Sequence, residues 1–208
     1  MLEKTKGFTL AEILITLAVL GILAAIMLPT VTQARPNKHK SLFKKAYYVA
    51  ERMVYELVND EDLYPSTSVT LGLDNVSDVE YLGTHYGSAS VENDKKSKFC
   101  GLFARKVNTT SDTAQCDSVH STFANTDSNK PSFKTTDGIA WYMPFTDFSG
   151  SGAETIRVDV NGEAKPNCAY SNTCPDPDRF EIRVVKDGKM FVNGTKEKEY
   201  LESNNSLR

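Results

Sequence analysis

Charge is almost absent from the first part of this sequence of 208 residues: between Phe8 and Leu28 the only charged side chain is Glu12. After residue 35 there is no second apolar run of that length, and the chain becomes rich in Ser, Thr, Asn and Asp. The sequence therefore contains one membrane-length segment, at its N-terminus, followed by a soluble part of about 170 residues.

Signatures of catalysis are also missing. The three histidines, His39, His85 and His120, lie in unrelated contexts, no serine sits in a nucleophile elbow, and no paired-histidine motif occurs. Gly83 and Gly87 do not form a phosphate-binding loop. The net charge of −3 argues against a nucleic-acid partner, since surfaces that bind nucleic acids are usually basic. We expect a protein that is not an enzyme and does not bind nucleic acid.

Cysteine is scarce, with four residues, all in the soluble part. An even number in an exported domain favours two disulfides. Of the three pairings we predict the local one, Cys100–Cys116 and Cys168–Cys174, with free buried thiols as the alternative. A zinc site is disfavoured, because neither pair has the two-residue spacing of a zinc knuckle and no histidine lies close.

The apolar run FTLAEILITLAVLGILAAIML is long enough, at about 1.5 Å per residue, to cross the roughly 30 Å of a bilayer core. A secretory signal peptide would have a shorter apolar core and a small-residue cleavage site after it, and Pro29-Thr30-Val31 is a poor site of that kind. A simple anchor explains the length and the basic residues before it, but it does not explain Glu12. A carboxylate inside a membrane helix costs on the order of 3 kcal/mol and normally has a partner.

The residues GFTLAEILITLAVLGILAAIMLP resemble the processing signal of type IV pilins and type II secretion pseudopilins. In that family a prepilin peptidase cuts after the glycine, and the new N-terminal residue, usually Phe, is N-methylated. The resemblance implies removal of residues 1–7, by a cut between Gly7 and Phe8, and methylation of Phe8. It also assigns subunit assembly to Glu12 and a kink or break in the helix to Pro29.

The soluble part begins with a helical pattern. Over residues 37–59 apolar side chains recur at three- and four-residue steps, which predicts an amphipathic helix suited to packing on a sheet. Strands are predicted at 139–143, 155–160, 180–185 and 190–192, with a hairpin turn at Lys186–Lys189. The order of these elements predicts the α+β class. The resemblance implies the pilin-like fold, with a variable loop region at 60–136, a sheet of about four antiparallel strands at 137–193 and a polar tail at 194–208.

The loop between the second and third predicted strands carries several oxygen donors, which suit calcium. These are Asp159, Asn161, Glu163, Asn167, Asp176 and Asp178. The loop is not an EF-hand, because its glycine is at the wrong position, but it is similar to loops that bind structural calcium in some pseudopilins. Cys168–Cys174 could staple the same loop without metal, and the acids could simply be solvated. Calcium is therefore the one cofactor that the sequence suggests.

The resemblance implies a structural subunit of a filament, and we expect a type II secretion pseudopilin; a type IV pilus subunit for adhesion, motility or DNA uptake is the alternative. The expected partners are other pilin-like subunits, the prepilin peptidase and an inner-membrane assembly platform. The expected location is a bacterial inner membrane, crossed once with residues 1–7 in the cytoplasm, residues 8–28 in the membrane and residues 29–208 outside. After assembly the subunit would belong to a periplasmic or cell-surface filament.

Overall fold

The computed structural model describes residues 7–33, 37–66, 72–87, 96–110, 116, 130–145, 148, 152–162 and 164–203. Tertiary contacts divide the chain into two units, residues 1–38 and residues 39–208. The first unit contains helix α1, Leu10–Gln33, and the second contains the sheets and the remaining helices. The leader residues 1–6 lie outside the described part of the chain.

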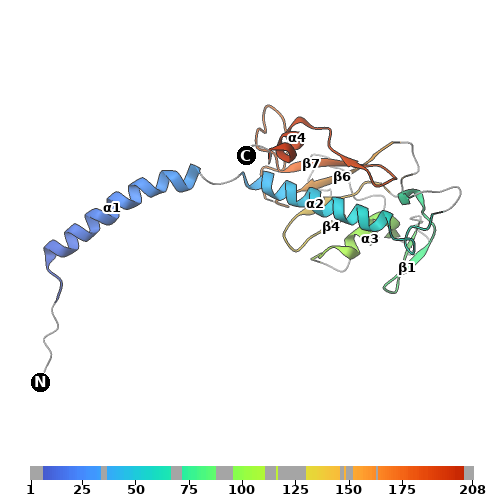
Figure 1. Cartoon of the computed structure of the whole chain (residues 1–208), viewed down its shortest axis with the longest axis horizontal. Helices are drawn as coiled ribbons and strands as arrows, with labels where there is room; N and C mark the ends of the chain where they lie inside the picture. Colours follow the sequence, from blue (N-terminus) through green and yellow to red (C-terminus); the bar gives the residue numbers. More distant parts are fainter. Residues whose placement is uncertain are drawn as a thin grey trace, which may run out of the picture. The chain divides into compact units, whose positions relative to one another are not determined.

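Helix α2, Lys38–Val58, is the long amphipathic helix of the second unit. The residues on its apolar face are buried, because they recur every three or four positions and so share one side of the helix. They are Phe43, Ala46, Ala50, Met53, Val54 and Leu57. Figure 1 shows this helix lying across the strands of the main sheet.

The main sheet has the strand order β4-β5-β6-β7-β8, and every neighbouring pair is antiparallel. The strands are β4 Phe133–Lys134, β5 Ala140–Tyr142, β6 Glu154–Asp159, β7 Arg179–Val184 and β8 Met190–Phe191. The predicted α+β class is confirmed, but the count of about four strands is too low, because a two-residue strand at Phe133 adds to the edge. Each residue adds only about 3.3 Å to a strand, so such a short one has no visible period in the sequence.

The hydrophobic core lies between α2 and the sheet. Alternate residues of β6 and β7 point toward the helix, since successive side chains of a strand face opposite sides. Ile156, Val158 and Ile182 are fully buried, and the ring of Phe180 stacks on that of Phe43 with centroids 4.3 Å apart. The hairpin between β7 and β8 turns at Gly188, whose φ is +85°.

The region expected to be a variable loop, 60–136, contains more regular structure than the sequence indicated. Strands β1 Val79–Tyr81, β2 Thr84–Gly87 and β3 Lys96–Ser97 form a small sheet, followed by helix α3, Lys98–Lys106. A 3-10 turn, η1, spans Gly72–Asp74. The bond Cys100–Cys116 ties α3 to residue 116. The parallel pairing of β2 with β3 depends on tertiary contacts and has no local sequence signal.

The segment expected to be a polar tail, 194–208, begins with a helix. Helix α4 spans Thr195–Glu202, and its Tyr200 is buried with its ring 5.8 Å from that of Phe180. The prediction missed this helix because its sequence, TKEKEYLE, has no apolar stripe to reveal it. Residues 204–208 lie outside the described part of the chain.

Candidate functional site

The N-terminal segment of the described chain presents apolar side chains to the exterior. Side chains from Phe8 to Ala25 are exposed, with Phe8 at 85% and Leu10 at 80%. An exposed apolar surface of this length marks a membrane or protein interaction site. Among the described residues, no helix is long and apolar enough to span a membrane.

Gly7 has no structural reason of its own to be glycine. A Cβ atom added there would meet nothing within 4 Å, and no positive φ requires the residue. A larger side chain would therefore leave this chain's conformation unchanged. The small size of residue 7 matters only to something outside the described chain.

Glu12 closes the start of α1. Its Oε2 accepts hydrogen bonds from the Thr9 backbone N–H at 2.7 Å and the Thr9 hydroxyl at 2.8 Å. The Glu12 backbone N–H donates to Thr9 Oγ1 at 3.3 Å. This is a capping box, in which residues three apart satisfy each other's backbone donors. The sequence analysis missed it, although the pattern Thr9-Leu10-Ala11-Glu12 is its ordinary signature.

The described residues give Oε1 of Glu12 no hydrogen-bond donor, so one oxygen of this carboxylate stays available. The arrangement is thus a glycine with open space around it, an exposed Phe8 and a carboxylate held one helical turn further on. Residues 3–28 match the family model described as the prokaryotic N-terminal methylation motif. The chain carries a prepilin-type methylation signal. No curated protein and no solved structure matches it.

The methylation motif covers the first part of α1, and the proline predicted to kink or break the helix lies just beyond it. Pro29 sits inside α1, which continues to Gln33. Proline lacks a backbone N–H and so cannot donate to the carbonyl of Ala25. The helix is therefore unbroken at Pro29 but lacks one of its hydrogen bonds there.

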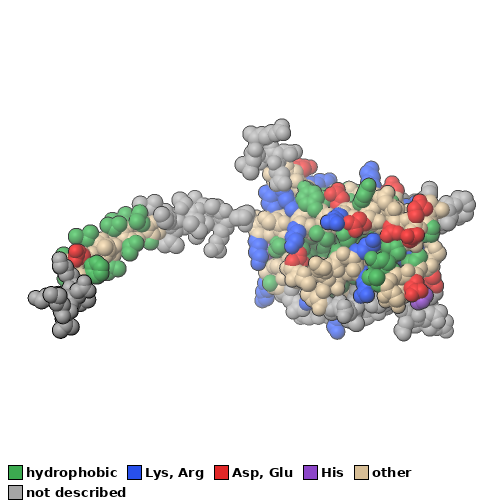
Figure 2. Space-filling model, turned by 60° about the horizontal axis from the view of Figure 1, so that its bottom comes forward, with side chains coloured by type: hydrophobic (Ala, Val, Ile, Leu, Met, Phe, Trp, Pro, Cys, Tyr) green, Lys and Arg blue, Asp and Glu red, His purple; other side chains and the backbone are tan. Residues whose placement is uncertain are grey.

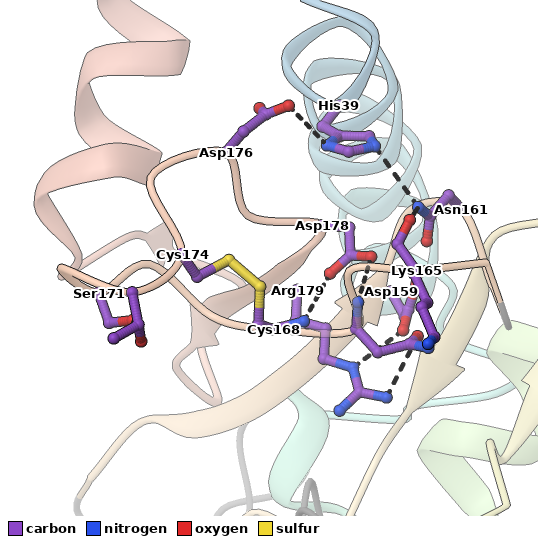
Figure 3. The surroundings of a disulfide bond; sticks show 12 residues. His39, Asp159, Asn161, Lys165, Cys168, Ser171, Cys174, Asp176, Asp178 and Arg179 are labelled. Carbon is purple, nitrogen blue, oxygen red and sulfur yellow. Dashed lines mark hydrogen bonds and ion pairs between the residues drawn. A yellow bond between two sulfur atoms is a disulfide. The ribbon is translucent and has the colours of Figure 1, made fainter.

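The second candidate site is the loop of predicted oxygen donors, shown in Figure 3. The bond Cys168–Cys174 closes it, so both disulfides of the structure join the cysteines in the predicted local pairs. Asp178 is fully buried and accepts hydrogen bonds from the backbone N–H groups of Asn167, at 2.7 Å, and Cys168, at 2.8 Å. The carboxylate of Asp178 therefore fixes the start of the disulfide loop.

Asp159 is also fully buried, and its charge is compensated by an arginine. The Nε of Arg179 donates to Asp159 Oδ2 at 2.9 Å. Turning the amide of Asn167 places its nitrogen 3.1 Å from the same oxygen, as a second donor. Burial raises the pKa of Asp159 to about 6; the charge of Asp178 acts in the same direction, and the hydrogen bond from Arg179 opposes both.

The remaining predicted calcium ligands point to the start of α2. Asp176 Oδ2 lies 3.5 Å from His39 Nδ1, and the amide nitrogen of Asn161 lies 3.4 Å from His39 Nε2. His39 thus connects α2 to two loops far along the chain. No signal in the sequence pointed to this role, because the partners are more than a hundred residues away from His39.

The five described donors are divided between two clusters, Asp159, Asn167 and Asp178 around Arg179 and Asn161 and Asp176 around His39. In the described part of the chain, no three His, Cys, Asp or Glu side chains are grouped to hold a metal ion. Glu163 lies outside the described residues. The arrangement fits calcium poorly, because an ion at Asp159 would have to displace the guanidinium of Arg179. Calcium binding by this loop stays a prediction.

Proposed function

We propose that the chain is a structural subunit of a type IV pilus-like filament, and that it assembles through α1. The support is the methylation motif together with Glu12, the only charge between Phe8 and Leu28. In this proposal residues 1–7 stay in the cytoplasm until a prepilin peptidase removes them. Residues 8–28 cross the inner membrane once, and the second unit lies outside.

Glu12 carries the proposal because its chemistry matches what cleavage creates. A cut after Gly7 gives Phe8 a positive amine, and one oxygen of the Glu12 carboxylate is left available by the capping box. A carboxylate and an amine are each costly in the membrane, on the order of 3 kcal/mol for a carboxylate at the centre of a helix. Pairing Glu12 with the Phe8 amine of a neighbouring subunit offsets both costs and sets the register between two otherwise apolar helices.

The second unit supports a pilin-like fold. An amphipathic helix, α2, covers one face of an antiparallel sheet, and a disulfide-pinned region lies between the helix and the sheet in sequence. We propose that α1 and α2 are the membrane half and the outer half of the pilin-type helix. The sheet and the loop closed by Cys168–Cys174 would then form the outer part of the subunit.

Among such filaments we propose that of a type II secretion system, in which a pseudopilin drives protein export. The paired strands β7 and β8 after a variable region, and the loop after Asp159, support this choice. Neighbouring genes for a secretion channel of the outer membrane would agree with it. Genes for a pilus retraction motor, and abundance of the chain in filaments sheared from the cell surface, would instead show a pilus subunit for adhesion, motility or DNA uptake.

The assembly role is tested with Glu12→Ala and Glu12→Gln in cells that express the full chain. We expect both variants to be cleaved normally, but to give about a tenfold lower yield of filaments, because a buried charge pair is lost. Glu12→Gln matters most, since glutamine still accepts hydrogen bonds from Thr9 but has no charge.

Thr16→Val is the matched control, because it also alters a polar side chain of α1, one whose hydroxyl donates to backbone carbonyls of its own helix. It should leave the filament yield unchanged. Normal filaments from Glu12→Ala would contradict the pairing of Glu12 with Phe8.

A further inference from the structure

The face of the main sheet that points away from α2 carries three arginines on two neighbouring strands. The antiparallel register places each one opposite an oxygen-bearing side chain. The pairs are Arg157 with Glu181, Arg179 with Asp159, and Arg183 with Thr155. The side chains line a hollow of about 390 Å³, which we call the arginine hollow. Its rim includes Tyr170 of the disulfide loop and Thr195 at the start of α4.

The positive charge of the arginine hollow is not fully compensated within the described chain. Arg157 and Arg179 each donate to a carboxylate, at 2.8 and 2.9 Å. Arg183 instead donates to neutral acceptors, the Thr155 hydroxyl at 2.7 Å and the Ala153 carbonyl at 2.6 Å. These two bonds orient its guanidinium without neutralising it. Such a preorganised guanidinium favours a carboxylate ligand.

A rigid acidic turn follows the last residue of α2. We use the name acidic turn for Asp60–Asp62. Asp60 accepts from the backbone N–H of Leu63 at 3.2 Å, and Leu63 and Tyr64 are buried, so the turn is anchored from both ends. Glu61 and Asp62 at its apex are exposed, and neither forms an ion pair with a described residue.

The two features lie toward opposite ends of α2. The disulfide loop on the rim of the arginine hollow reaches His39 in the first turn of α2, through Asp176. The acidic turn begins after Val58, which is about 30 Å away at 1.5 Å per residue. On the face shown in Figure 2, Lys and Arg are more numerous toward the end with α4, and Asp and Glu toward the other end.

We propose that the acidic turn of one copy of this chain docks into the arginine hollow of a second copy, with Glu61 and Asp62 facing Arg183. The contact joins two different surfaces, so it is heterologous, and repeating it gives an open chain of subunits rather than a closed dimer. The inference deepens the proposed filament function by naming a contact between the second units. It also rests on that function, since a subunit that stays single has no use for the contact.

The test uses charge reversal in the full chain. Arg183→Glu, and separately the pair Glu61→Lys with Asp62→Lys, should each lower filament yield about tenfold, because like charges then face each other. Combining all three substitutions should restore most of the yield. Arg105→Glu reverses an exposed charge outside both surfaces and should have no effect. If the combined variant assembles no better than the single ones, the docking contact is wrong.

A second measurement does not depend on charge or on the folding of Arg183→Glu. The native cysteines of the described chain are all in disulfides, so Asp62→Cys with Thr195→Cys adds two free thiols. Oxidised membranes should contain disulfide-linked dimers and higher ladders for the double variant, and neither for each single one. Absence of these species in cells that form filaments would overturn the contact. If the wild-type chain forms no filaments, and Glu12→Ala changes nothing, the proposed function itself fails.

Discussion

At the residue scale, the buried carboxylate of Asp159 makes the stability of the second unit depend on pH. Its pKa is about 6 in the folded chain, above the usual value of 3.8, because burial disfavours the charged form. Between these two values the folded state binds more protons than the unfolded state. The free energy of unfolding is therefore higher below pH 4 and falls as the pH rises through 6.

We expect this single group to contribute a decrease on the order of 2 kcal/mol from pH 4 to pH 7. The measurement is chemical denaturation at several pH values, with Asp159→Asn as the matched control. Asparagine has nearly the same shape and does not titrate, so its curve should lack this decrease. Parallel pH profiles for the two chains would contradict the burial argument.

The site residues differ in how visible they were in the sequence. Gly7, Phe8 and Glu12 lie close together in one motif, so local pattern was enough to single them out. The capping role of Thr9 was equally local, and it was missed only because the membrane motif drew attention to the charge of Glu12. The contacts of Asp159 with Arg179 and of His39 with Asp176 join distant positions, and only the folded chain brings them together.

At the scale of elements, the two disulfides close loops of different length. Cys100 and Cys116 are 16 residues apart, and Cys168 and Cys174 are six apart. A cross-link stabilises by restricting the unfolded chain, more so for a longer loop, which gives about 3 kcal/mol for the first bond and about 2 for the second. Cys100 and Cys116 are also buried in the core, so alanines there leave a cavity as well.

We therefore expect Cys100→Ala with Cys116→Ala to lower the free energy of unfolding more than Cys168→Ala with Cys174→Ala. Denaturation of the two variants beside the wild-type chain measures the difference. The shorter loop keeps its anchor, since the backbone N–H groups of Asn167 and Cys168 still bind Asp178. A larger loss from the shorter loop would show that Cys168–Cys174 holds more of the fold than loop closure explains.

The elements that sequence revealed are those with a strong period of their own. The residue range 37–59 predicted for a helix encloses α2 at Lys38–Val58, and the four expected strands fall within one residue of β5, β6, β7 and β8. Lys186–Lys189 turns as expected, with Gly188 at positive φ. The strand β4, the small sheet and α4 were missed, because short strands and a helix of mostly charged residues carry too few apolar positions to show a period.

At the scale of the whole molecule, the two units divide the work. The first carries the processing site and the one charge of an otherwise apolar helix, and the second carries a stable core with charged surfaces. The exposed apolar residues of α1 would be a liability in a protein that stayed single in water. They are explained if α1 is held by lipid before assembly and by neighbouring helices afterwards.

The most direct test of the account is the intact mass of the chain isolated from cells that contain a prepilin peptidase. The account predicts a chain that begins at Phe8, lacks residues 1–7 and carries the added mass of one methyl group on its N-terminal amine. Gly7→Leu should leave the leader in place without disturbing the fold, because nothing lies within 4 Å of a Cβ atom at that position. A wild-type chain that keeps residues 1–7, or is cut elsewhere, would contradict the central claim.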